Sequence, residues 1–164
     1  MTSYLPNLAR DNLSFYTIPL ALVVALAPRI FAANTYAAAT KKPASDQVKT
    51  MPRSFSQIVS DDPAVDSKTK GRILRAGAAV DNSYENLGIF AAAVTAGNMA
   101  GVGVGRMKAM SIGYVVVRVA YNHIYIFQDL VPPPVRSVAY MTGALLCMAM
   151  FVQAGIAMNA RTLL

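Results

Sequence analysis

The sequence has few charged residues, one cysteine and one histidine, and each scarcity argues against a class of protein. Charged residues make up 14% of the 164 residues, about half the share that is usual in soluble domains. The single cysteine, Cys147, rules out an intrachain disulfide, and its apolar surroundings favour a small buried side chain. The single histidine, His123, has no second histidine or paired cysteine beside it, so no metal site is expected.

The charges are almost absent from four long apolar stretches. The stretches at 86–105 and 137–160 contain none, the stretch at 109–127 contains only Arg118, and the stretch at 14–39 contains only Arg29. A helix needs about 20 mostly apolar residues to cross the hydrocarbon core of a bilayer. The sequence therefore predicts an all-α fold, an integral membrane four-helix bundle, formed by a single domain over residues 1–164.

Proline, glycine and charge set the expected helix boundaries. Three consecutive prolines at 132–134 break the chain and suit the first turn of a helix that follows them. Glycines at 97, 101, 103 and 105 mark a turn between the second and third predicted helices. The predicted helices cover about 14–39, 71–97, 106–129 and 135–160, with a long polar loop at 40–70.

Two other interpretations of the apolar stretches are disfavoured. A soluble buried bundle would need polar stripes at helical spacing, and the stretch at 138–148 shows none. A cleaved signal peptide would need a short uninterrupted apolar core. The first stretch is longer than that, and Pro19, Pro28 and Arg29 interrupt it.

The long loop predicts the orientation of the chain. Residues 40–72 hold seven Lys or Arg residues and four Asp residues. Because basic loops collect on the cytoplasmic side, the loop at 40–70 is expected in the cytosol and both termini on the far side. The formal net charge of +7 then reflects topology and attraction to membrane lipids, and no nucleic-acid partner is expected.

Polar residues inside the predicted helices are spaced so that each set shares one helical face. The sets are Arg75, Asn82 and Glu85; Arg118, Tyr121 and Tyr125; and Arg136, Ser137 and Tyr140. The predicted topology brings all three sets to the cytosolic half of the bundle. Buried guanidinium, amide and phenol groups suit a small anionic ligand. The alternative is an internal Glu85–Arg118 ion pair with tyrosines in an interfacial belt.

These residues resemble the MAPEG family, the membrane-associated proteins in eicosanoid and glutathione metabolism. Arg75-Ala76 followed by Asn82-Ser83-Tyr84-Glu85-Asn86 and Phe90 resembles the family's second-helix signature. Arg118-Val119-Ala120, Tyr125 and Arg136-Ser137-Val138-Ala139-Tyr140 are similar to the third and fourth helices of prostaglandin-E-synthase-type members. The resemblance covers about half of the chain.

The resemblance implies a homotrimer in the endoplasmic reticulum or another internal membrane, with glutathione bound between subunits. Carried onto the matching positions, Asn82 and Glu85 would hold the polar ends of glutathione, and Glu85 would also pair with Arg118. Tyr125 and Tyr140 would line the pocket, and Arg75 and Tyr121 would contribute to it. Arg136, with Ser137, would stabilise the glutathione thiolate, which would attack a lipophilic electrophile or peroxide.

The chain departs from the family pattern at several positions, and other functions stay open. Eicosanoid-forming members carry an arginine within a turn before the signature asparagine, where this chain has Ala78 to Asp81. Tyr121 replaces a histidine and Gly88 a proline. The main alternative to a glutathione-dependent transferase or peroxidase is a non-catalytic tetraspan scaffold or assembly protein. A small transporter fits less well, because no pair of interrupted helices is repeated in the two halves.

Overall fold

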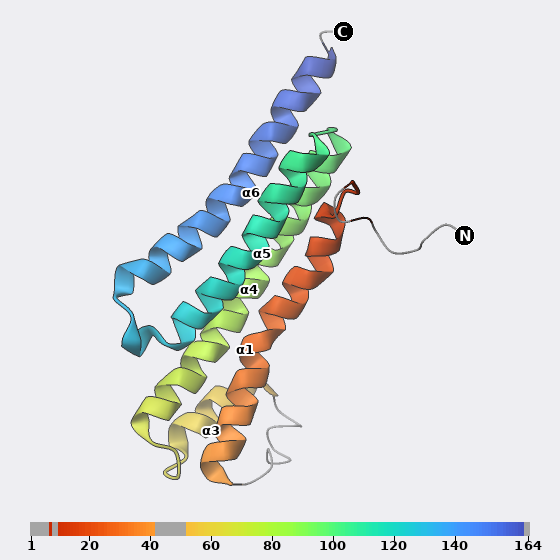
Figure 1. The fold of residues 1–164 in the computed structure, drawn as a ribbon. Coiled ribbons are helices and arrows are strands. Elements are labelled where there is room, and N and C mark those ends of the chain that lie inside the picture. Colours follow the sequence, from red (N-terminus) through yellow and green to blue (C-terminus); the bar gives the residue numbers. More distant parts are fainter. Residues whose placement is uncertain (1–6, 8–9, 42–51, 163–164) are drawn as a thin grey trace, which may run out of the picture.

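The computed structural model describes residues 7, 10–41 and 52–162, and in them the fold is all-α. Four long helices lie side by side in an elongated bundle, and the short helix α3 lies beside one end of it (Figure 1). The helices are α1 (Thr17–Thr40), α3 (Phe55–Asp61), α4 (Ser67–Met99), α5 (Val104–Ile126) and α6 (Pro133–Thr162), with single 3₁₀ turns η1 (Ser14–Tyr16), η2 (Pro52–Ser54) and η3 (Gln128–Leu130). The predicted fold class is confirmed.

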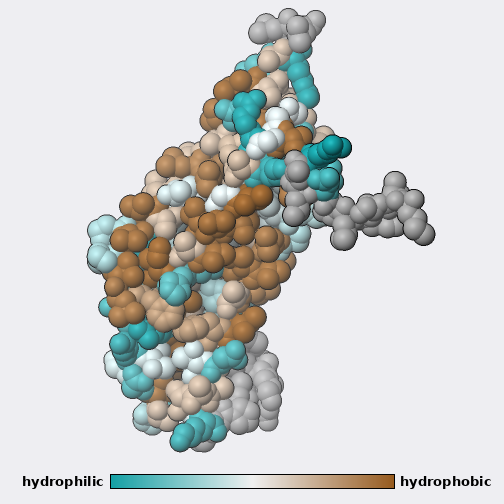
Figure 2. Space-filling view, viewed as in Figure 1, coloured by the Kyte–Doolittle hydropathy of each residue, from teal (hydrophilic) through white to brown (hydrophobic). Residues whose placement is uncertain are grey.

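Two of these helices are long and apolar enough to cross a membrane by themselves: Ser14–Thr40, which joins η1 to α1, and Pro133–Arg161 in α6. The more polar helices α4 and α5 pack between and along them, with α4 in contact with α1, α5 and α6. Figure 2 shows one face that is mostly hydrophobic through the middle of the bundle, with hydrophilic residues more frequent toward its ends. These features agree with a bundle embedded in a membrane.

The ends of α4 extend beyond the predicted range of 71–97, and local hydrogen bonds explain the difference. At the start, the backbone N–H groups of Lys68 and Thr69 donate to the carboxylate of Asp66, over 3.0 and 3.1 Å, which caps the helix at Ser67. At the other end, Gly101 has a φ of 74°. Val102 N–H then donates to Gly97 O over 3.0 Å, the pairing that closes a Schellman turn.

Part of the loop expected at 40–70 is helical, while its residues 42–51 lie outside the described residues. Helix α3 is held against the bundle by Val59, which is fully buried, and by an edge-to-face contact between Phe55 and Tyr36 of α1. The Tyr36 hydroxyl also lies 2.7 Å from an Asp62 carboxylate oxygen, which accepts its hydrogen bond. These contacts fasten the loop to α1 and α4.

The core of the bundle joins α4, α5 and α6. Phe90 of α4 and Tyr114 of α5 stack with ring centroids 3.9 Å apart and planes 8° from parallel. Met107 and Met150 complete this layer and are fully buried. The packed layer fixes the spacing of the three helices that carry the predicted site residues.

Candidate functional site

A cavity of about 360 Å³ opens between α4, α5 and α6; we call it the main cavity. It falls within the usual range of small-molecule pockets, ~300–1,000 Å³. Six of the nine predicted site residues line it. Its lining consists of Asn82, Tyr121, Tyr125, Arg136, Ser137, Tyr140 and Met141.

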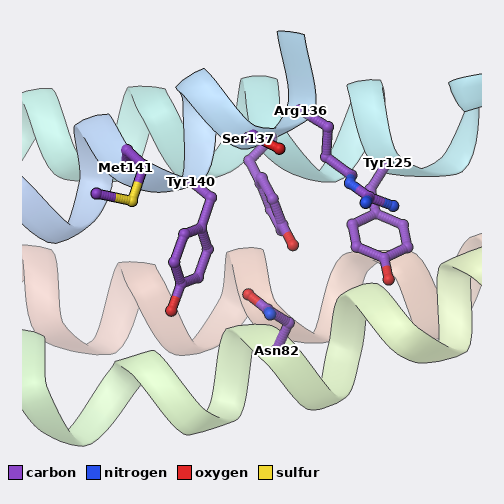
Figure 3. Close-up of a pocket in the computed structure, with 7 residues that line it drawn as sticks. Asn82, Tyr125, Arg136, Ser137, Tyr140 and Met141 are labelled. Atoms are coloured by element: carbon purple, nitrogen blue, oxygen red, sulfur yellow. The ribbon is translucent and has the colours of Figure 1, made fainter. Parts of the chain in front are cut away.

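Helix α6 supplies Arg136, Ser137 and Tyr140 from its first two turns, because their spacing places them on neighbouring positions of one face. The Arg136 guanidinium carbon lies 4.8 Å from the centroid of the Tyr125 ring, a cation–π contact that holds it at the edge of the cavity. Figure 3 shows Tyr140 and Asn82 pointing into the cavity from α6 and α4, which face each other.

Arg118 lies behind the main cavity and is only 4% exposed. Its Nη2 donates to Ser83 Oγ over 2.9 Å and to Asn82 Oδ1 over 3.4 Å. Its guanidinium carbon also lies 4.4 Å from the centroid of the Tyr121 ring. Because Asn82 Oδ1 also accepts from Asn86 Nδ2, the amide nitrogen of Asn82 is the group left to donate toward the cavity.

The main cavity is electropositive. Arg136 lines it and Arg118 lies directly behind it, while no Asp or Glu contributes to its lining. Within the described residues, no carboxylate is ion-paired with Arg118. An anion that enters this space would be stabilised by the Arg136 guanidinium and by the phenol and amide donors around it, and the charge of Arg118 lies behind that lining.

The family model described as "MAPEG family" matches residues 13–156, nearly the whole chain. The chain belongs to the MAPEG family. It is therefore a membrane protein of eicosanoid and glutathione metabolism, and the family resemblance predicted from the sequence is confirmed. No curated protein and no solved structure matches the chain.

In this MAPEG chain, Arg75 does not reach the main cavity. Its Nη2 pairs with Asp129 Oδ1 over 2.7 Å, and its Nε donates to the carbonyl of Ile126 over 3.0 Å. Arg75 shares a face with Asn82, as predicted, but seven residues along a helix amount to about 10 Å of rise. That distance places Arg75 beside the end of α5 instead of beside the cavity.

Glu85 also lies apart from the cavity, and the expected Glu85–Arg118 pair does not form within the described chain. Arg118 bonds to Ser83 and Asn82 instead. At about 100° per residue, Glu85 points about 160° away from Ser83, which accepts the shorter of the two Arg118 hydrogen bonds. The Glu85 side chain is exposed on the outside of the subunit.

Three residues of the site were not predicted: Met141, Ser83 and Asn86. Met141 follows Ser137 by four residues, a spacing that puts it on the same helical face and could have revealed it. Ser83 and Asn86 anchor Arg118 and Asn82. Their role depends on the rotation of α4 about its own axis, which the sequence pattern does not determine.

Proposed function

We propose that this MAPEG protein is a membrane-bound, glutathione-dependent transferase or peroxidase that acts on lipophilic electrophiles. The observation that carries this proposal is that Arg136 lines a cavity with no carboxylate in its lining, while Arg118 is hydrogen-bonded to the back of the lining residue Asn82. Glutathione suits such a cavity because it presents two carboxylates and a thiol that reacts as its anion. Family membership supports the choice of glutathione over other anions.

The residues that line the main cavity would have different roles in binding glutathione, according to their chemistry. Arg136, at the exposed end of the cavity, would hold the thiolate by charge, and the adjacent Ser137 hydroxyl would donate a hydrogen bond to it. Asn82, Tyr125 and Tyr140 would bind the polar groups of the tripeptide. A guanidinium near a thiol lowers its pKa from ~8.5 and raises the fraction present as nucleophile at neutral pH.

Access from the bilayer is consistent with a lipophilic second substrate. Met141 lines the cavity and is exposed on α6, next to the exposed side chains of Val138 and Leu145. A hydrophobic molecule dissolved in the membrane would reach Arg136 along this face. In transfer, the glutathione sulfur would bond to the electrophilic carbon, and either a leaving group departs with its electron pair or the electrons of a conjugated double bond shift and take up a proton from water. In peroxide reduction, the thiolate would attack one peroxide oxygen, the O–O bond would break and the alcohol would leave after protonation. A second glutathione would then displace water from the oxidised sulfur to form the disulfide.

A homotrimer is part of the proposal, and the outer face of α4 supports it. Exposed positions along this face include Gly88, Ala92 and Thr95, and small residues of this kind let helices approach closely in lipid. Glu85 lies on the same outer surface. In an assembly that packs through α4, Glu85 would face a neighbouring subunit and would reach glutathione only across that contact.

Calorimetric titration of glutathione into the detergent-purified protein tests the binding step. We expect saturable binding to the wild type and weakening by about tenfold or more in Arg136→Gln, since a hydrogen bond to a charged group is worth about 1.5–3 kcal/mol. Asn82→Ala should weaken binding as well. The matched control, Lys41→Gln, removes one exposed positive charge from a residue that does not line the cavity, and should bind normally. A folded wild type that does not bind millimolar glutathione contradicts the proposal.

A non-catalytic scaffold is the second candidate, and one observation favours it. Arg118 is satisfied inside the subunit by Ser83, Asn82 and the Tyr121 ring, so the buried polar layer could serve packing alone. If the protein is a scaffold, its wild type binds no glutathione and its Arg136→Gln variant assembles normally. If it is a catalyst, its wild type binds glutathione, and Arg136→Gln assembles but loses that binding.

We further propose that the chain lies in an internal membrane with the loop at 40–70 in the cytosol. The high count of basic residues in that loop supports this orientation. Cys147 is buried, so a cysteine introduced at the exposed Ser56 can be labelled selectively. Ser56→Cys should react with an impermeant maleimide added on the cytosolic side, whereas Arg10→Cys should react only from the other side; the reverse result would invert the topology.

A further inference from the structure

A second cavity, of about 310 Å³, lies between α1, α4 and the η2–α3 segment. It is separate from the main cavity: Asn82 lines the main cavity, while its neighbour Asp81 turns about 100° around α4 and lines this one. None of the residues in the proposed glutathione site contributes to it. Its lining is Arg29, Ala32, Arg53, Phe55, Ser56, Gly77, Val80 and Asp81.

Two arginines from distant parts of the chain face this second cavity. Arg29 comes from the middle of α1, and Arg53 comes from η2. Within the described residues neither side chain forms an ion pair or a hydrogen bond, and Asp81 is not ion-paired with either of them. Two like charges and one carboxylate leave the cavity with an excess of one positive charge.

The position of Arg29 in the apolar helix α1 indicates that the second cavity holds a charged group. It is the only charged residue in the apolar span Ser14–Thr40. Charged residues in membrane helices are costly and usually face a cavity or a partner. The neighbouring Leu26 and Ile30 are exposed on α1, so the cavity borders an apolar surface that lipid chains would cover in a membrane.

The loop side of the cavity is held in place by packing. Phe55 contacts the Tyr36 ring with centroids 5.6 Å apart, and Val59 of α3 is fully buried. Figure 1 shows α3 beside the loop end of α1 and α4, the end at which the bundle would meet one headgroup layer. Arg53 lies in η2, which directly precedes this packed helix, and lines the cavity together with Arg29.

We propose that this second cavity binds the headgroup of an anionic phospholipid. Its phosphate would lie between Arg29 and Arg53, because guanidinium groups bind phosphate oxygens through paired hydrogen bonds. Asp81 would accept a hydrogen bond from a headgroup hydroxyl or ammonium, and the acyl chains would lie on the exposed face of α1. Basic pockets between membrane helices are known to hold such headgroups. The lipid would join α1 to the loop segment.

Lipid retention in nanodiscs tests this proposal. The full chain is placed in phosphatidylcholine discs with or without phosphatidylglycerol, and native mass spectrometry and thermal unfolding are measured. The wild type should retain phosphatidylglycerol selectively and unfold at a higher temperature in its presence. Arg29→Gln and Arg53→Gln should each lower retention by about tenfold. Arg53→Gln alters an exposed side chain, so its folding should be unaffected.

The control variant is Lys41→Gln, which removes an equal charge from the residue that follows α1, does not line the second cavity, and should retain the lipid as the wild type does. Equal loss in all three variants, or no loss in either arginine variant, would overturn the proposal, since general surface attraction would then suffice. Adding inorganic phosphate to the protein in neutral detergent distinguishes a lipid phosphate from a free phosphate as the ligand. If inorganic phosphate raises the unfolding temperature as much as phosphatidylglycerol does, and the increase is lost in Arg29→Gln, that result would contradict a lipid ligand.

Glutathione binding, measured on the same variants, distinguishes this site from the proposed catalytic one. Arg29→Gln and Arg53→Gln should bind glutathione as the wild type does. A tenfold loss of glutathione affinity in Arg29→Gln, without any change in lipid retention, would assign the second cavity to glutathione and overturn the proposal. If the chain binds no glutathione at all, lipid retention still decides this inference by itself.

Discussion

The side-chain amide of Asn122 donates a 3.0 Å hydrogen bond to the backbone carbonyl of Val24. Pro28 has no N–H, so it leaves this carbonyl of α1 without its helical donor. Asn122 Oδ1 in turn lies 3.2 Å from Ser83 Oγ, which accepts a hydrogen bond from Arg118. A buried polar chain therefore runs from the proline of α1, through α5 and α4, to the arginine behind the main cavity.

This relationship predicts that Asn122 and Pro28 are energetically coupled. Asn122→Ala should lower the free energy of unfolding by about 1–3 kcal/mol, the cost of leaving a buried carbonyl unpaired. In a Pro28→Ala background the same change should cost less, because the N–H of the new alanine can donate to Val24. A double-mutant cycle on denaturant unfolding in detergent measures the coupling. Purely additive losses would show that Asn122 does not replace the missing donor.

A second prediction concerns the charge cluster that joins the start of α4 to η3. Asp129 pairs with Arg72 and Arg75 over 2.8 and 2.7 Å. The hydrogen bond from Arg72, together with the charges of Arg72 and Arg75, holds the pKa of Asp129 below its ordinary value of 3.8. A carboxyl with a lowered folded pKa stabilises the fold above its unfolded pKa, and this contribution is lost as the pH falls through the folded value.

The wild type should therefore lose thermal stability as the pH is lowered from about 5 to about 3, and Asp129→Asn should lose less over the same interval. Unfolding temperatures measured by circular dichroism across that range test this difference. Asp61→Asn is the matched control, because Asp61 is exposed on α3 and takes no part in the cluster. If the unfolding temperature of Asp129→Asn depends on pH as steeply as that of the wild type, the cluster does not stabilise the folded chain.

The sequence was sufficient to predict the class of fold and most of the main cavity. The long apolar stretches predicted the helices, and two of them, in α1 and α6, are long and apolar enough to cross a membrane. Helical spacing put Tyr121 and Tyr125 on one face of α5, and Arg136 and Tyr140 on one face of α6, and all four line the main cavity. These signals are local, since helical periodicity and hydropathy follow from neighbouring residues.

The parts that the sequence did not predict depend on contacts between helices. Arg75 shares a face with Asn82, but its partner Asp129 could be identified only once the end of α5 was placed beside α4. The exposed position of Glu85 depends on how α4 rotates to bring Ser83 to Arg118. The link from Asn122 to Val24 likewise required the relative height of α1 and α5.

A third prediction tests assembly through α4. Gly88 lies on the outer face of α4, and a side chain added there would meet nothing within 4 Å in its own subunit. The same holds for Gly155 of α6. Gly88→Leu should therefore disrupt the proposed trimer without unfolding the subunit, while Gly155→Leu should leave the oligomer intact. Mass photometry of both variants in detergent measures the oligomer, and an unaffected Gly88→Leu trimer would place the interface on another helix.

We propose that Arg136 stabilises a glutathione thiolate in the main cavity. The most direct test of this proposal is a pH titration of the thiolate absorbance of bound glutathione, in the wild type, Arg136→Lys and Arg136→Gln. We predict that the thiol pKa of bound glutathione lies below its free value of ~8.5 in the wild type, rises part of the way to that value in Arg136→Lys and reaches it in Arg136→Gln. Identical titration curves in all three proteins would contradict the proposal.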